Sequence, residues 1–215
     1  MRTKLIFFIV VLLAVLAGWI IGKDASRERV SDPTATATGT PSVIIERVPA
    51  TATTSAFALP NLDRPIKVTA TLSQETKTKT IARIQELTDE LRNNNDFYSS
   101  WLDLALQRNL IGDYVAAEEI WIYVTQNWAN DPVAYSNLAN LYLMEFHDNE
   151  RAEIYLLRAI EKNTTQVIFY ENAYSFYRFV KKDFTKARQI LEEGIAKNPT
   201  NAVGLRQLLA DLEST

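Results

Sequence analysis

The sequence predicts an all-α protein, a right-handed solenoid of about three helix-turn-helix units with capping helices, and two spacings carry this prediction. The first series repeats every 35 residues and pairs an Asp with an Ala four positions later: Asp113 with Ala117, Asp148 with Ala152, and Asp183 with Ala187. The second repeats every 34 residues and pairs an aromatic residue with an Ala: Trp101 with Ala105, Tyr135 with Ala139, and Phe169 with Ala173. A fixed period near this length indicates stacked units. The solenoid is expected over residues 96–215.

A long apolar run near the N-terminus predicts a membrane helix over residues 5–22, after a cytoplasmic tail at 1–4. The run "LIFFIVVLLAVLAGWII" contains no charge, and at about 1.5 Å per residue it spans a bilayer core. Cleavage after Ala17 by a signal peptidase is the alternative. Trp19, Ile20 and Ile21 favour an uncleaved anchor, because they extend the run to bilayer length. The numbers of Lys and Arg on the two sides of the run are nearly equal, so charge does not decide the orientation. We expect an extracytoplasmic C-terminal domain because the short N-terminal tail is expected to stay in the cytoplasm.

Residues 23–72 are expected to form a disordered linker. From residue 31 to 60, Thr, Ala and Pro dominate stretches such as "DPTATATGTP", and this part has no helical or strand period. Near its end, Ile66, Val68 and Leu72 alternate with polar residues as in a half-buried strand. This segment is either an extended arm that docks on the folded domain or plain linker, and the sequence leaves both open.

Helices are predicted at both ends of the repeats. Over residues 73–95, Ile81, Ile84, Leu87 and Leu91 form a narrow apolar stripe that needs a partner surface. Thr78 and Ala82 continue the 35-residue series backwards, so this segment is a leading helix or half-repeat. At the C-terminal end, four leucines form one apolar face of a helix that closes the stack: Leu205, Leu208, Leu209 and Leu212.

Each unit combines small and large residues at fixed places. In the first unit, Trp101, Leu104, Ala105 and Arg108 share one face of the first helix, and the second helix turns three residues inward: Ala117, Trp121 and Val124. The small residues allow close helix approach, and the large ones fill the gaps between units. Asp113, Asp148 and Asp183 are expected to be N-caps, because a carboxylate accepts the free N–H groups of a first helical turn. The recurring positions therefore mark helix starts and contacts.

This pattern resembles the tetratricopeptide repeat, in particular small membrane-anchored bacterial proteins of that family. The resemblance rests on the aromatic and Ala series above and on bulky residues that follow the second Ala: Trp121, Leu156 and Leu191. Three positions depart from the family pattern: Arg108 stands for Tyr, Asn172 for Leu, and Gly194 for Ala. The turn between the helices also lengthens by one residue in the second unit and again in the third.

Composition disfavours enzymatic and cofactor chemistry. The chain has no Cys and a single His, His147, so neither a thiol nucleophile nor a plausible metal set is present. We expect His147 to be an exposed turn residue. A Gly-rich phosphate loop is also absent. From residue 98 onward the chain carries 11 Lys and Arg against 16 Asp and Glu, and this net negative charge disfavours nucleic acid. We expect no enzyme activity, no metal and no cofactor.

The resemblance implies a peptide-binding groove lined by the first helix of each unit. The implied groove residues are Leu102, Leu106, Asn109, Asn137, Asn140, Tyr170, Tyr174 and Tyr177. An exposed Tyr stripe would favour peptide contact, whereas packing of these rings against the terminal helix is the alternative. Asn137 and Asn140 would hydrogen-bond the backbone of an extended peptide. Leu102 stands where the family's carboxylate-clamp subclass has Lys, so a receptor for chaperone tails is not expected.

The expected function is therefore a membrane-tethered scaffold or adaptor that binds a protein or peptide partner in cell-envelope assembly. The alternative is a self-assembling structural membrane protein, which exposure of Ile81, Ile84 and Leu87 would favour. An enzyme that shares its active site with a partner chain is the least favoured function.

Overall fold

The computed structural model describes residues 58–214, and every regular element in this range is helical. The all-α prediction is confirmed for this part of the chain. None of the helices between residues 58 and 214 has both the length and the hydrophobicity needed to cross a membrane. The expected tail at 1–4, the membrane helix at 5–22 and the first part of the linker, up to residue 57, lie outside the described residues.

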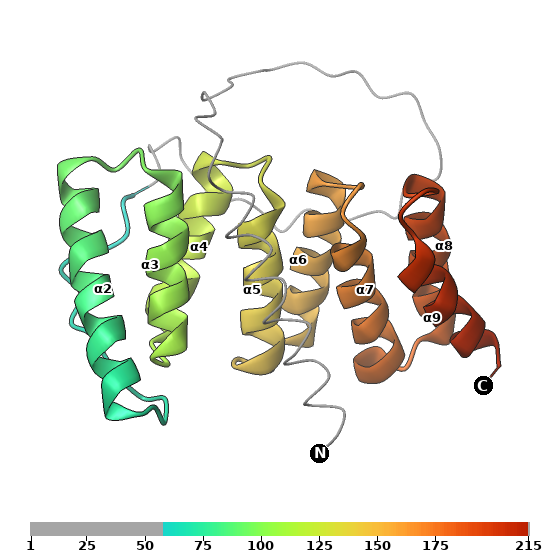
Figure 1. Cartoon of the computed structure of the whole chain (residues 1–215), viewed down its shortest axis with the longest axis horizontal. Coiled ribbons are helices and arrows are strands. Elements are labelled where there is room, and N and C mark those ends of the chain that lie inside the picture. The colour runs from blue at the N-terminus through green and yellow to red at the C-terminus, as the bar shows by residue number, and fades with distance from the viewer. Residues whose placement is uncertain (1–57, 215) are drawn as a thin grey trace.

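The helices lie side by side in chain order, from α2 at one end of the molecule to α9 at the other (Figure 1). Their bounds are α2 (Gln74–Asn93), α3 (Tyr98–Leu110), α4 (Tyr114–Asn127), α5 (Pro132–Met144), α6 (Asn149–Lys162), α7 (Val167–Ser175), the π-helix η2 (Phe176–Lys181), α8 (Phe184–Lys197) and α9 (Val203–Glu213). Each helix packs chiefly against the helices before and after it. The core is therefore continuous along the row rather than gathered at one centre.

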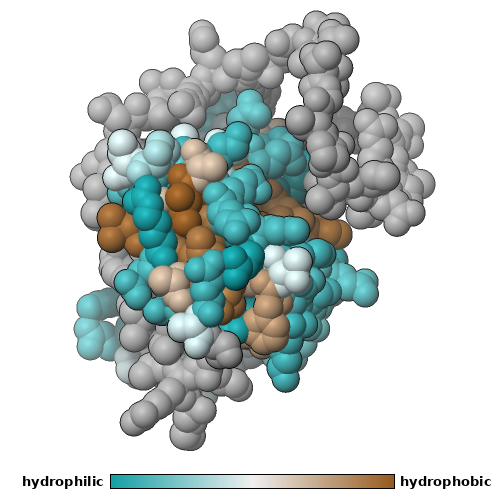
Figure 2. Space-filling view, turned by 90° about the vertical axis from the view of Figure 1, so that its right-hand side faces the viewer, coloured by the Kyte–Doolittle hydropathy of each residue, from teal (hydrophilic) through white to brown (hydrophobic). Residues whose placement is uncertain are grey.

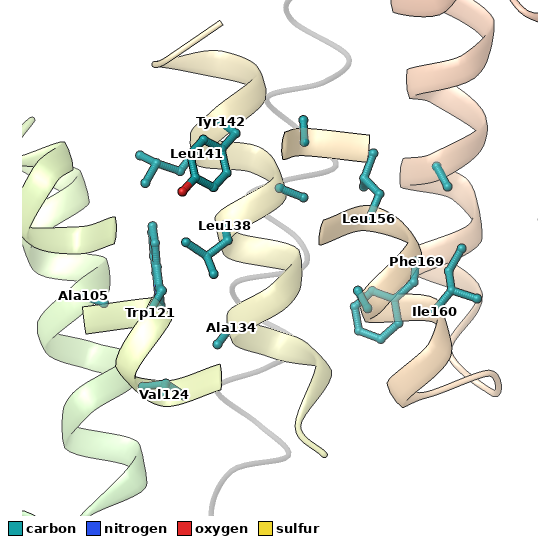
Figure 3. Packing of buried hydrophobic residues seen from close by; sticks show 14 of the residues in the cluster. Ala105, Trp121, Val124, Ala134, Leu138, Leu141, Tyr142, Leu156, Ile160 and Phe169 are labelled. Carbon is teal, nitrogen blue, oxygen red and sulfur yellow. The ribbon is translucent and has the colours of Figure 1, made fainter. Parts of the chain in front are cut away.

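Small residues at repeated places allow the helices to pack closely. All six Ala residues of the two series are fully buried: Ala105, Ala117, Ala139, Ala152, Ala173 and Ala187. Large residues fill the space between neighbouring units. Trp121 projects from α4 toward Leu138 and Leu141 of α5, as Figure 3 shows, and all three are buried. The pattern of small and large residues thus builds the core as the spacings predict.

A left-handed residue reverses the chain inside each unit. Gly112, His147 and Lys182 stand 35 residues apart and have φ of 81°, 54° and 55°. Each directly precedes the Asp that begins the next helix. Only glycine adopts this conformation without cost, so His147 and Lys182 carry local strain. His147 is exposed at its turn, as expected.

Two of the three expected N-cap hydrogen bonds form. Asp148 accepts the backbone N–H of Arg151, and Asp183 accepts that of Lys186, both at 2.9 Å. Asp113 stands at the N-cap position of α4 but makes no side-chain capping bond. Its carboxylate instead binds the guanidinium of Arg108. Asp113 thus occupies the predicted N-cap position, but the predicted side-chain bond is missing because a buried cation competes for the same oxygens.

The extra residue of the third unit lies inside a helix rather than in the turn. Seven positions separate Tyr135 from Tyr142, whereas eight separate Phe169 from Tyr177. The π-helical turn η2 absorbs the additional residue, since its hydrogen bonds close a longer ring than those of an α-helix. This corrects the expectation that the turn itself lengthens a second time.

The leading helix α2 buries its apolar stripe against the rest of the domain. Ile84, Leu87 and Leu91 are almost fully buried, and α2 packs on α3. This stripe therefore has its partner within the chain and does not favour self-association. Thr78 and Ala82 are exposed, so the 35-residue burial pattern does not continue backwards into α2. The segment is a leading helix with its own register.

The segment before α2 is an extended arm docked on α3 and α4. From residue 61 to 72 its side chains alternate between exposed and half-buried, and Leu62, Ile66, Val68 and Leu72 pack against the core. The backbone N–H groups of Thr69 and Ala70 both donate to the carbonyl of Ile111. Of the two alternatives for this segment, the structure favours docking. Residues 58–72, expected to be linker, thus pack against the helices.

The terminal helix α9 closes the row. Leu205 is buried against α8, and Leu208, Leu209 and Leu212 are half-buried against the core. The outer face of α9 is largely polar, as Figure 2 shows for this end of the molecule, where hydrophilic residues surround a few hydrophobic ones. A polar outer face is what an end helix needs, because no further unit covers it.

Candidate binding face

One face of the row brings together most of the predicted groove residues. The first aromatic residues of the units give α3, α5 and α7 a common register. Two positions after each stand Asp103, Asn137 and Glu171, and five positions after each stand Leu106, Asn140 and Tyr174. Half-buried residues at these positions, and next to them on the same helices, form one surface, which we call the α3–α5–α7 face. Its residues are Leu102, Asp103, Leu106, Asn109, Asn137, Asn140 and Glu171.

Five predicted groove residues remain partly accessible on this face. Leu102 and Leu106 pack against the core with one side, and Asn109, Asn137 and Asn140 are half-buried. Among the described residues, no side-chain hydrogen bond satisfies the amides of Asn137 and Asn140. Because an amide offers both a donor and an acceptor, this pair is chemically suited to bind a peptide backbone.

The three predicted tyrosines do not form an exposed stripe. Tyr170, Tyr174 and Tyr177 are exposed by 0%, 5% and 3% of their surface. A Cβ placed on Gly194 would lie 2.7 Å from Cγ of Tyr170 and 2.7 Å from Cδ1 of Leu205. The Tyr170 ring therefore packs directly on the backbone of α8, which explains why Gly stands where the family has Ala. All three rings are therefore buried in the core, and contact with the terminal helix, the alternative for these rings, is seen at Tyr170 beside Leu205 of α9.

Tyr177 is withdrawn from the predicted groove by the π-helical turn. The additional residue in η2 rotates Tyr177 toward the neighbouring unit, where its hydroxyl donates to Glu153 at 2.8 Å. Tyr142, at the matching place on α5, donates in the same way to Glu118. A cation completes each group, Arg151 beside Tyr142 and Lys186 beside Tyr177. Tyr142 and Tyr177 thus join consecutive units.

The same contacts set the charge state of Glu153. Burial by itself would raise the pKa of this carboxyl, but hydrogen bonds from Tyr177, Lys181 and Lys186 outweigh it and hold the pKa below its usual range. Glu153 is thus a structural anion between units. Its matching group on the preceding unit, Glu118, meets Arg151 with 3.3 Å between Oε1 and Nη1.

A second polar site holds the arm, and the sequence did not predict it. The Arg108 and Asp113 side chains are only 4% and 5% exposed and lie 2.8 Å apart. Arg108 also donates to the carbonyls of Pro65 and Arg64 at 3.2 and 3.1 Å. The only signal in the sequence was the departure from the family pattern, Arg where Tyr is expected. Arg108 replaces that ring with a guanidinium that satisfies the backbone of the arm.

Gly112 completes the contact with the arm. A Cβ at this position would lie 2.2 Å from Oγ1 of Thr69 and 2.8 Å from the backbone N of Ala70. A side chain is therefore excluded here, whereas His147 and Lys182 occupy the matching turns without an arm beside them. Between the arm and helices α3 and α4 lies a cavity of about 10 Å³, room for about one water molecule.

Within residues 58–214, no group of three or more His, Cys, Asp or Glu side chains is placed to hold a metal ion. The surfaces that remain are the α3–α5–α7 face and the docked arm.

No protein-family model matches the sequence, and no curated protein matches it.

Proposed function

We propose that the protein is a membrane-tethered scaffold of the tetratricopeptide type, which binds a partner protein on its α3–α5–α7 face during assembly of the cell envelope. In this proposal the helices form a right-handed solenoid, residues 5–22 anchor it in the membrane, and the domain lies on the extracytoplasmic side. The 34- and 35-residue series and the burial of their Ala residues support the repeat assignment.

The observation that carries the proposal is the pair of amides on α5. Asn137 and Asn140 are half-buried, stand three positions apart on one helical face, and have no side-chain hydrogen bond to other described residues. Polar groups that are partly withdrawn from water without a partner lose hydration that a ligand can restore. Leu102 and Leu106 on α3 add apolar surface beside them. An extended peptide offers both kinds of contact.

Site-specific cross-linking in the native membrane tests this function. A photoreactive benzophenone amino acid replaces Asn140 or, as a control, Glu150, which is exposed at the start of α6. We expect one partner protein to be cross-linked from position 140, not from position 150, and to be lost when Asn137 is also changed to Ala. Equal cross-linking from both positions would contradict binding at this face. Adducts of the chain with itself alone would favour the self-assembling alternative.

A further inference from the structure

A row of three polar residues runs along the α3–α5–α7 face and bears on the charge of a ligand that could bind there. Asp103, Asn137 and Glu171 stand 34 residues apart at the same place on α3, α5 and α7. All three are half-buried. The row therefore places an acid at each end and an amide in the middle.

The first acid of the row is already satisfied by a guanidinium. Arg83 of the neighbouring helix α2 donates to Oδ2 of Asp103 from Nε at 2.9 Å and from Nη2 at 2.8 Å. Gln107 donates to the other oxygen of Asp103 at 2.8 Å. Two guanidinium nitrogens thus share one carboxylate oxygen in charge-assisted hydrogen bonds. The molecule itself thus shows how an acid in this row is complemented.

The last acid of the row lacks such a complement. Among the described residues, no ion pair or side-chain hydrogen bond reaches the carboxylate of Glu171. A Cβ on Gly204 of α9 would lie 3.0 Å from its Oε1 atom, so the carboxylate is held against the first turn of that helix. Burial raises the pKa of Glu171. A half-buried carboxylate without a counter-charge destabilises the free protein, and a cation would relieve this cost.

We propose that the partner segment carries an Arg or Lys side chain that pairs with Glu171 while its backbone lies along α5. This inference rests on the proposed function, since it names the chemistry of the segment that the face binds. The net charge of the repeats is negative, which steers a basic segment toward them. Arg is the better fit, because its planar fork can donate two hydrogen bonds to one carboxylate, as Arg83 does to Oδ2 of Asp103.

Selection from a peptide library tests the proposal directly. The full-length protein in detergent micelles is immobilised and challenged with a phage-displayed library of random decapeptides. We expect the enriched peptides to share a basic residue at one position. Their affinity should fall about tenfold for Glu171→Gln, and citrulline, the neutral analogue of arginine, should weaken binding equally in the peptide. Glu150→Gln, an exposed acid on α6, should leave the affinity unchanged.

Two other results would overturn the inference in distinguishable ways. Peptides without an enriched basic residue, whose binding is lost with Asn137→Ala but kept with Glu171→Gln, would remove the role of Glu171 and leave the proposed function in place. Selected peptides that bind equally to the Asn137→Ala, Asn140→Ala and Glu171→Gln variants would remove both. Circular dichroism on each variant confirms that a loss of binding does not reflect unfolding.

Discussion

Single residues in this protein are best understood by what their polar atoms contact. Tyr170 and Tyr177 are both buried, yet only the second has a partner for its hydroxyl. The hydroxyl of Tyr177 donates to Glu153, whereas that of Tyr170 meets no hydrogen-bond partner among the described residues. Burial, with a smaller contribution from the charge of Glu193, raises the pKa of Tyr170 to about 12. Tyr170 is thus held for its ring and not for its hydroxyl.

This contrast predicts opposite effects of the same chemical change. Tyr170→Phe removes a hydroxyl without a partner, so we expect the free energy of unfolding to stay constant or rise by up to about 1 kcal/mol. Tyr177→Phe removes a donor from the Glu153 carboxylate, so we expect a loss of about 1 to 2 kcal/mol. Urea denaturation of both variants measures the difference. Equal losses would contradict the distinction between the two hydroxyls.

The stability of the protein should depend on the titration of Glu171. The folded-state pKa of this group is raised by burial, so its contribution to stability is fully present below the pKa of the unfolded chain. That contribution is lost as pH rises through the raised folded-state pKa. We therefore expect Glu171→Gln to be more stable than the native protein near neutral pH, with the difference shrinking as pH falls through the raised folded-state pKa and levelling off below the unfolded-chain value of about 4.3. Thermal unfolding across this range measures it.

The opposite sign would have a defined meaning. If Glu171→Gln is less stable than the native protein at neutral pH, the carboxylate stabilises the adjacent first turn of α9 through its charge. Glu171 would then be a structural residue of the terminal helix.

At the scale of elements, the arm is the least expected part of the domain. The arm contains no regular secondary structure, yet four of its side chains pack against the core: Leu62, Ile66, Val68 and Leu72. Arg108 holds the arm by donating hydrogen bonds to two of its backbone carbonyls. The backbone groups of an extended segment need partners when they are covered. Arg108 and Ile111 supply them, and the carbonyl of Gly112 accepts the hydroxyl of Thr69. All three residues lie within one helix end and its turn. The first unit thus differs from the others because it holds the arm.

Gly112 is the position at which this contact can be tested. Gly112→Ala forces a side chain into the left-handed region and against Thr69 and Ala70, so we expect a loss of at least about 2 kcal/mol in unfolding free energy. The arm should also become sensitive to protease near residue 70. Lys182→Gly supplies the control, since it relieves the backbone strain of a matching turn without an arm and should stabilise by about 1 kcal/mol. A loss for Gly112→Ala no larger than this backbone contribution would contradict the role of the arm.

At the scale of the molecule, the proposed scaffold combines an anchor, a spacer and a row of helices. Contacts between helices are mainly sequential, so the row offers long side surfaces rather than a closed central site. Its two ends are covered by α2 and α9. In the proposed scaffold, the residues between the anchor and the arm would set the distance of the binding face from the membrane.

Deletion of residues 5–22 tests the anchor. We expect the full chain to sediment with membranes and the deleted form to move to the soluble fraction, because no helix within residues 58–214 could replace the span. With the full chain, protease added outside intact cells should digest the repeat domain. Protection of the domain from external protease would place it on the cytoplasmic side, and unchanged sedimentation after deletion would contradict the anchor.

Much of the fold of the described residues follows from local sequence patterns. The 34- and 35-residue series place the helices, because residues that recur at a fixed period on helices must meet the same neighbours. Local sequence also predicts the caps at Asp148 and Asp183, because a carboxylate there reaches the N–H groups of the next helical turn. The closing helix α9 is predicted by the apolar stripe of its leucines.

The contents of the candidate site depended on contacts between segments distant in sequence. The carboxylate of Asp113 binds Arg108 and does not cap helix α4. Tyr177, which follows the start of the π-helical turn, contacts Glu153 of the preceding unit. Tyr170 was buried by Gly194 and Leu205, and Asp103 was satisfied by Arg83 from α2 while Glu171 was left without a cation. Helical periodicity places a side chain on a face, so the sequence by itself determined the helices and their inward residues. Only the tertiary structure decided whether another segment covers that face. The covering residues are distant in sequence and do not belong to the repeat series, so the repeat spacing does not predict them.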